Sequence, residues 1–167
     1  MKILKFIYKK IKKKEAPYYY DYSLLVILAK PLRKFIAQVV APNCPFNRLR
    51  VLIYKICGFR IGKHCFIGMH CYLDDMCFDI LKIGNNVSIS YGVFFACHGP
   101  KQDFLPITIE DNVYIGMRAC VISKSTSDDG IVIGKGSIIG ACTLVNKSIP
   151  KESVVVGIPC KIIKERK

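Results

Sequence analysis

Aliphatic residues recur every six positions over much of the chain, from Ile61 to Val145, and a glycine often follows them. A period of six fits neither the 3.6-residue repeat of an amphipathic helix nor the two-residue alternation of a strand. It predicts a triangular solenoid, a parallel β-helix in which each hexapeptide forms a short strand and a corner, and about 18 residues complete one coil. The positions in phase are Ile61, Ile67, Leu73, Ile83, Ile89, Phe95, Ile109, Ile115, Val121, Ile133, Ile139 and Val145.

The residue two positions before an inward aliphatic residue should also point into the prism, and it must be small. These positions include Cys65, Cys71, Cys77, Val87, Val93, Val113, Ala119, Ser137 and Thr143. Three of the nine cysteines are therefore predicted to be core residues. The odd count and the lack of any Cys-x-x-Cys pair do not suit a disulfide framework, so we expect a reduced, cytoplasmic protein.

The repeat is interrupted at three places. Four extra residues separate Leu73 from Ile83, which predicts a small loop near Asp79. The gap of 14 between Phe95 and Ile109 predicts a loop over residues 97–106. Residues 127–130 break the pattern without losing phase, which predicts a milder bulge. Insertions into a solenoid tend to gather on its binding face, so we expect the chemistry there.

The N-terminal segment has a different character. Residues 1–60 carry a net charge of +12 and residues 61–167 only +2. We expect a domain boundary after residue 57, with a basic helical segment before it and the β-helix over 58–167. Residues 1–14 form a basic amphipathic helix by spacing. It is either a solvated or trimer-packing helix, or it docks on an anionic membrane surface. Nucleic acid is disfavoured, because no base-reading motif accompanies the lysines.

The residue pattern of the rest of this segment predicts a link over 15–22 and a helix over 23–40 that is interrupted or begins again at Pro31. It then predicts a turn over 41–46 and a short helix over 47–57 that caps the β-helix. We find no secretory signal pattern, and no run approaches the ~20 apolar residues of a membrane span. We therefore expect a cytoplasmic protein, at most peripheral to the inner face of a membrane.

His98 opens the longest loop, where a neutral imidazole can accept a proton from a hydroxyl. Asp74 and Asp75 precede the first loop, on the same side one coil earlier, and either carboxylate could hold an acceptor hydroxyl or orient the imidazole. Asp103, inside the loop, is a further candidate. His64 and His70 are six residues apart and should lie on successive faces, which disfavours a metal site.

Three stretches resemble the hexapeptide-repeat O-acetyltransferases, the group that contains maltose and galactoside acetyltransferases. They are Ile107-Thr-Ile-Glu-Asp-Asn-Val-Tyr-Ile-Gly, Ile133-Gly-Lys-Gly-Ser-Ile-Ile-Gly-Ala and Val154-Val-Val-Gly-Ile-Pro-Cys-Lys-Ile-Ile-Lys. The resemblance covers residues 58–164. It implies a left-handed β-helix, a homotrimer, and acetyl-CoA bound between neighbouring subunits, with no metal.

The resemblance also implies roles for particular residues. His98 matches the general base and Asp75 a residue on the acceptor side. Met117, Ala141, Asn146 and Lys147 match positions along the pantetheine arm, and Lys161 and Lys164 match positions near the nucleotide phosphates. Tyr114 stands where many members have Trp, and Asn146 stands where Thr is common. We count Tyr114 with the cofactor-binding positions.

The sequence thus predicts an acetyl-CoA-dependent O-acetyltransferase that acts on a sugar or glycan hydroxyl. Two other functions are open: a non-catalytic, membrane-associated scaffold, and a metal-dependent lyase similar to the γ-class carbonic anhydrases. The second needs a subunit-bridging histidine pattern that His64, His70 and His98 do not reproduce.

Overall fold

The computed structural model describes residues 11, 24–75, 78–98, 104–123 and 130–165. The helix expected over 1–14 (apart from Ile11), the link over 15–22, Cys77 and Asp103 lie outside the described residues. The chain divides into two compact units, Met1–Phe35 and Ile36–Lys167. The helices after Phe35 therefore belong with the β-helix, whereas the sequence placed the boundary after residue 57.

Apart from Ile11, the described part of the first unit is helix α2 (Leu24–Phe35), which carries Arg33 and Lys34 in its last turn. Pro31 lies inside α2, so the expected interruption there is wrong. A proline removes a single backbone donor, and here the helix continues past it. Within the described residues, no helix combines the length and the apolar character that crossing a bilayer requires.

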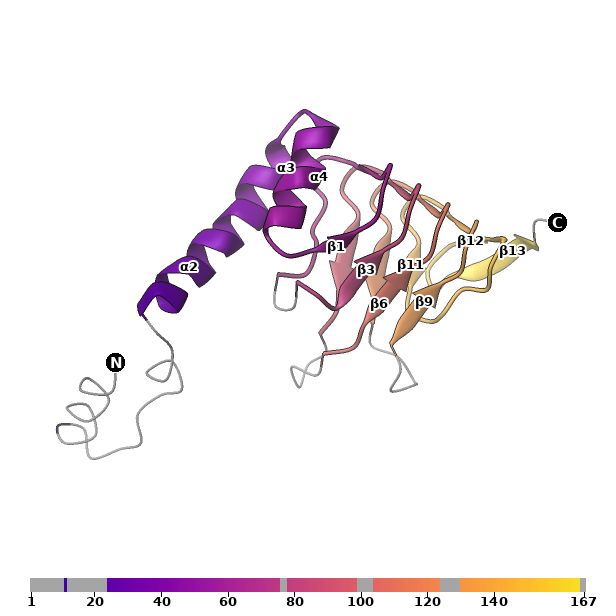
Figure 1. Ribbon diagram of the computed structural model, residues 1–167. Helices are drawn as coiled ribbons and strands as arrows, with labels where there is room; N and C mark the ends of the chain where they lie inside the picture. Colours follow the sequence, from indigo (N-terminus) through magenta and orange to yellow (C-terminus); the bar gives the residue numbers. More distant parts are fainter. Residues whose placement is uncertain (1–10, 12–23, 76–77, 99–103, 124–129, 166–167) are drawn as a thin grey trace. The chain divides into compact units, whose positions relative to one another are not determined.

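Three short helices open the second unit. They are the π-helix η2 (Ile36–Val40), α3 (Ala41–Asn43) and α4 (Asn47–Ile56). Helix α4 confirms the short helix expected over 47–57, and it lies against the first coil of the β-helix (Figure 1). One face of α4 bonds to that coil. Asn47 Nδ2 donates to Cys65 O at 3.1 Å, and Arg50 Nε donates to Ile67 O at 2.6 Å. The fully buried Tyr54 donates through its hydroxyl to Cys71 O at 3.3 Å.

The β-helix has three faces, and every strand pair in them is parallel except β12–β13. Face 1 contains β1 (Arg60–Ile61), β3 (Leu81–Ile83), β6 (Ile107–Ile109) and β9 (Ile131–Ile133). Face 2 contains β2 (Phe66–Ile67), β4 (Ser88–Ile89), β7 (Tyr114–Ile115), β10 (Ile138–Ile139), β12 (Ser153–Val156) and β13 (Lys161–Glu165). Face 3 contains β5 (Phe94–Ala96), β8 (Cys120–Ile122) and β11 (Leu144–Val145), and Tyr72 bridges to Phe94 in the first coil. The predicted parallel β-helix with N-terminal helices is confirmed.

The core of the prism is the predicted one. All twelve aliphatic or aromatic positions of the six-residue phase are buried, and so are the small inward residues that the structure describes. Cys65 and Cys71 are among them, which confirms their role in packing. The eight described cysteines are all free thiols. Burial of this column in every coil is the main force that holds the solenoid together, because it removes a continuous apolar surface from water.

The corners between strands use left-handed backbone. His64, His70, Asn86, Asn112, Arg118 and Cys142 have φ between 54° and 59°. His64 and His70 therefore lie at successive corners of the first coil and not side by side. This backbone turns the chain sharply while its carbonyls and amides stay in the parallel ladders.

All three interruptions of the repeat fall at one corner of the prism, between face 3 and face 1, as the described residues on either side of them show. The register aligns Ile61, Ile83, Ile109 and Ile133, which are 22, 26 and 24 residues apart in place of about 18. The third interruption is therefore a full insertion of six residues, and the expected milder bulge is wrong. Six residues equal one period, so the sequence pattern kept its phase and hid the insertion. We call residues 74–80, 97–106 and 123–130 the first, second and third excursions.

Candidate active site

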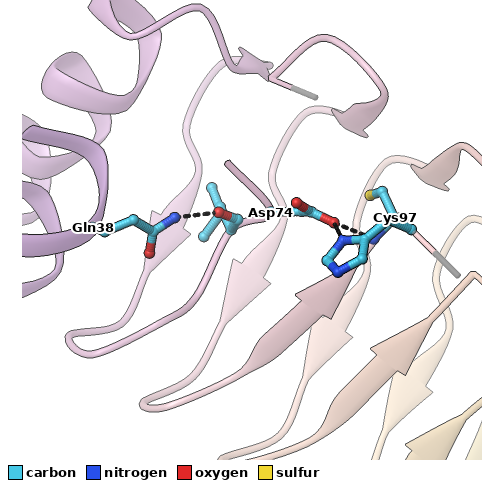
Figure 2. A network of polar contacts seen from close by, with 5 residues as sticks. Gln38, Asp74 and Cys97 are labelled. Carbon is cyan, nitrogen blue, oxygen red and sulfur yellow. Dashed lines mark hydrogen bonds and ion pairs between the residues drawn. The ribbon is translucent and has the colours of Figure 1, made fainter. Parts of the chain in front are cut away.

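A histidine and a carboxylate meet at the corner from which the excursions leave. His98 lies two residues after the end of β5, and Asp74 lies two residues after Tyr72, which bridges to β5. His98 Nδ1 lies 2.6 Å from Asp74 Oδ2 (Figure 2). Asp74 is fully buried, whereas the His98 side chain is 35% exposed. The pair therefore has a fixed inner member and an outer member that a substrate can reach.

The Asp74 carboxylate is held by backbone as well as by the imidazole. The Cys97 N–H donates to the same Oδ2 at 2.7 Å. A carboxylate oxygen only accepts, so the contact assigns the proton of the neutral imidazole to Nδ1. The lone pair of Nε2 then faces away from Asp74. This is the tautomer that a general base needs, with Nε2 as the proton acceptor.

The capping helices reach the same segment. Gln38 Nε2 donates to Leu73 O at 2.7 Å, one residue before Asp74 (Figure 2). Leu73 itself is fully buried in the prism. The backbone that presents Asp74 is thus fixed from the core side by packing and from the helix side by a hydrogen bond.

Asp75 follows Asp74 in the chain, and its side chain is also buried. Burial raises the pKa of Tyr72 to about 12, and the negative charges of Asp75 and Asp74 add to the effect. The Tyr72 ring stacks on Phe94 with centroids 4.5 Å apart and planes 11° apart. Tyr72 and Phe94 therefore form a stacked aromatic pair on face 3, and Tyr72 remains a neutral hydrogen-bond donor at physiological pH.

The residues matched to the pantetheine arm occupy two corners. Met117 and Ala141 are exposed and stack in successive coils at the corner between faces 2 and 3, where Cys142 N donates to Met117 O at 2.9 Å. Asn146 and Lys147 follow β11, so they share the corner of His98 two coils further on. Both are exposed. The structure therefore brings Asn146 and Lys147 to the His98 corner, and it places Met117 and Ala141 across face 3 from it.

The other matched residues lie on face 2. Tyr114 points outward from β7, and its hydroxyl accepts a hydrogen bond from Ser90 Oγ at 3.1 Å. Lys161 and Lys164 lie on β13, paired with Val156 and Val154 of β12. All three side chains are exposed. This group is separated from His98 by a corner and by face 3, so only an extended ligand could contact both.

Sequence reasoning did not single out Tyr72, Phe94 or Gln38. A signal for the first two exists, because the aromatic residues stand 22 residues apart, the same separation as the aligned Ile61 and Ile83. No comparable signal exists for Gln38. Its contact depends on how the helices fold back on the first coil.

Comparison with known proteins agrees with this architecture. Residues 106–147 match the family described as the hexapeptide repeat of succinyl-transferase. The matched stretch lies within the β-helix, from β6 to β11. The fold class expected from the resemblance is thereby confirmed.

The chain is similar to curated acetyltransferases. It is 34% identical to the serine acetyltransferase of Bacillus licheniformis over 138 residues, 81% of the chain and 58% of the relative. It is 33% identical to the galactoside O-acetyltransferase of Escherichia coli over 124 residues, 64% of the chain and 57% of the relative. The chain thus spans less than two thirds of the length of each of these relatives.

A solved structure shares the fold along most of this chain. The hexapeptide-repeat acetyltransferase of Vibrio cholerae superposes with a TM-score of 0.67 at 22% identity, over 87% of this chain and 94% of that one. A second structure of the Vibrio protein, in complex with acetyl coenzyme A, superposes with a TM-score of 0.59 at 18% identity, over 93% and 95%.

Proposed function

We propose that this protein is an acetyl-CoA-dependent O-acetyltransferase in which His98 is the general base and Asp74 holds it in place. The observation that carries the proposal is the 2.6 Å contact between His98 Nδ1 and the buried Asp74, at the corner from which all three excursions leave. The similarity to a galactoside O-acetyltransferase and a serine acetyltransferase supports acetyl transfer as the reaction class. The acetyl coenzyme A complex of the Vibrio protein supports the donor.

The proposed reaction is a direct transfer. His98 Nε2 takes the proton of the acceptor hydroxyl while the hydroxyl oxygen attacks the thioester carbonyl of acetyl-CoA. The carbon–sulfur bond of the resulting tetrahedral intermediate breaks, and the imidazolium returns its proton to the departing thiolate. The products are an acetyl ester and free CoA. Asp74 stabilises the imidazolium and keeps the ring oriented, without taking the proton itself.

The proposed acceptor is a hydroxyl of a sugar or glycan, with Asp75 and Asp103 on its side of the site. Serine is the competing acceptor, because one relative is a serine acetyltransferase. Thiol release from acetyl-CoA across a panel of sugars, lipid-linked glycans and serine separates the two. Preference for serine would replace the sugar in the proposal and leave the chemistry unchanged.

The proposed cofactor path runs along Met117, Ala141, Asn146 and Lys147, with Tyr114, Lys161 and Lys164 toward the nucleotide end. These exposed positions extend from the His98 corner across face 3 to face 2, and we propose that a neighbouring subunit of a homotrimer encloses acetyl-CoA along them. Analytical ultracentrifugation tests the trimer. A scaffold without activity would bind no acetyl-CoA in calorimetry, and a metal-dependent lyase would retain a metal on purification.

Replacement of the base tests the proposal directly. We expect His98→Ala to lower turnover by about 10²–10⁴-fold, because the hydroxyl then loses its proton acceptor. Acetyl-CoA binding by calorimetry should be unchanged. His70→Ala is the matched control, since His70 is exposed at a corner of the first coil and the one contact described for its side chain is with the Tyr91 ring. Wild-type turnover in His98→Ala would remove His98 from the role.

A further inference from the structure

Helix α4 exposes a row of large apolar side chains on the face turned away from the β-helix. Leu49, Leu52 and Ile56 are 47%, 51% and 75% exposed, and Phe46 at the N-cap is 71% exposed. The i, i+3, i+7 spacing places the three helical residues in one stripe. The opposite face is fully used, because Asn47, Arg50 and Tyr54 bond to the first coil. The stripe is therefore available for something outside the described fold.

Basic side chains border this stripe. Arg48 and Lys55 lie on the same side of α4 as Leu52 by helical spacing. Together with His64 they line a pocket of about 230 Å³ between α4 and the first corner of the β-helix. Lys55 Nζ donates to Gly62 O at 3.1 Å, which holds the ammonium at the pocket. The pocket is of a size to take a single phosphate group, and its charged side chains are cations only.

The charge of the surrounding sequence indicates what can cover the stripe. Residues 24–60 contain seven Lys or Arg and no Asp or Glu, and residues 1–14 contain seven Lys. The chain's own N-terminal segment, or the same surface of a second copy, would bring like charges together. A negatively charged partner is favoured by the same interaction. The stripe is a convex helix surface with no groove, which suits the plane of a bilayer better than a peptide.

We propose that Phe46, Arg48, Leu49, Leu52, Lys55 and Ile56, the α4 surface, dock on an anionic phospholipid bilayer. The apolar row enters the boundary between headgroups and acyl chains, and the pocket of Arg48, Lys55 and His64 takes a headgroup phosphate. The inference does not depend on the acetyltransferase activity. It goes beyond the helix over residues 1–14, because it assigns a membrane contact to the folded unit itself.

A fluorescent reporter tests the apolar row. The chain contains no tryptophan, so Leu52→Trp introduces a single tryptophan, excited at a wavelength that tyrosine does not absorb, at an exposed position. In the full-length protein we expect its emission to shift to shorter wavelength with vesicles of phosphatidylglycerol and phosphatidylcholine, and to stay unchanged with phosphatidylcholine alone. Val132→Trp on face 1 is the control and should not respond. An unshifted Leu52→Trp spectrum on vesicles that bind the protein would overturn the proposal.

A charge pair tests the pocket. We expect Arg48→Gln/Lys55→Gln to weaken co-flotation with the anionic vesicles by at least about 10-fold, from the known contribution of each basic residue near a charged bilayer. Lys82→Gln/Lys151→Gln removes the same charge from exposed positions elsewhere and should have a much smaller effect. Equal loss in both pairs would mean that net charge alone drives binding. A change of oligomeric state in Leu52→Ser/Ile56→Ser, with vesicle binding intact, would assign the stripe to a second copy. Either result overturns the proposal.

Discussion

Asp74 combines two contacts in one oxygen atom. Its Oδ2 accepts hydrogen bonds from the backbone of Cys97 and from the imidazole of His98, at 2.7 Å and 2.6 Å. A buried carboxylate that is also held by the backbone N–H next to His98 cannot rotate away from the ring. The orientation of His98 therefore depends on a residue that a substrate never touches, which makes Asp74 a positioning residue.

Asp74→Asn should preserve the size and position of the side chain while it lowers the rate of acetyl transfer. The amide can donate a proton toward Nδ1, which favours the tautomer with Nε2 protonated and no longer able to accept. We expect kcat to fall by about 10²–10⁴-fold. The KM for acetyl-CoA should be nearly unchanged, measured by thiol release at saturating acceptor.

The control for this substitution is Asp79→Asn, an exposed carboxyl in the first excursion, 3.9 Å from Arg60. A second readout is the double variant His98→Ala/Asp74→Asn. It should be no slower than His98→Ala alone, because residues that act as one unit are not additive. Fully additive losses would show that Asp74 acts independently of the imidazole.

Helix α4 solves a problem that every open solenoid has at its first coil. The strands there would leave backbone amides and carbonyls without partners, as at any sheet edge. Asn47, Arg50 and Tyr54 satisfy these groups from one helix face, and Asn47 Oδ1 also accepts from Ile67 N at 3.0 Å. The helix is thus a cap for the first coil, built from side chains in place of a further strand.

Arg50 is the cap residue whose substitution should lower the stability most. It is buried and donates to the carbonyls of Ile67 and Cys44. We expect Arg50→Met to lower the free energy of unfolding by about 2–4 kcal/mol, because charged hydrogen bonds are lost and buried carbonyls are stranded. Denaturant unfolding followed by circular dichroism measures the loss. Arg48→Met, on the exposed side of the same helix, should change the stability by less than about 0.5 kcal/mol. Equal effects would argue against the cap.

At the scale of the whole molecule, the coils stack closely at their corners. The corner between faces 2 and 3 has Gly68, Ser90, Gly116 and Gly140 in successive coils. A Cβ added at Gly116 would come within 2.5 Å of Ala141 N and 2.7 Å of Gly140 C, both backbone atoms of the next coil. Neither can move without separating the coils.

Gly116→Ala should therefore destabilise the solenoid as a whole. We expect a loss of about 1–3 kcal/mol, the usual cost of overpacking a rigid contact, measured as a lower denaturation midpoint. Ser90→Ala in the same column is the control, since that position already carries a Cβ and the variant loses only the bond to Tyr114. A Gly116→Ala midpoint equal to that of Ser90→Ala would mean that the coils adjust without cost.

Much of this molecule could be predicted from the sequence, because one six-residue period fixes strand, corner and core together. The period could not show that residues 123–130 are an insertion, since six extra residues preserve it. It also could not tell Asp74 from Asp75. Both follow Leu73 at a corner, where inward and outward phases no longer alternate, and only the folded backbone decides which carboxylate meets His98. The Gln38 contact depends on helix packing, which the repeat does not encode.

The shared corner of the three excursions has a consequence for how such a chain can change. The insertions are four, eight and six residues long, yet Ile83, Ile109 and Ile133 each rejoin the column of Ile61 in register. Re-entry is governed by the next inward aliphatic side chain and not by the length of what precedes it. The surroundings of His98 can therefore be rebuilt, one excursion at a time, while the hydrophobic prism beneath them stays as it is.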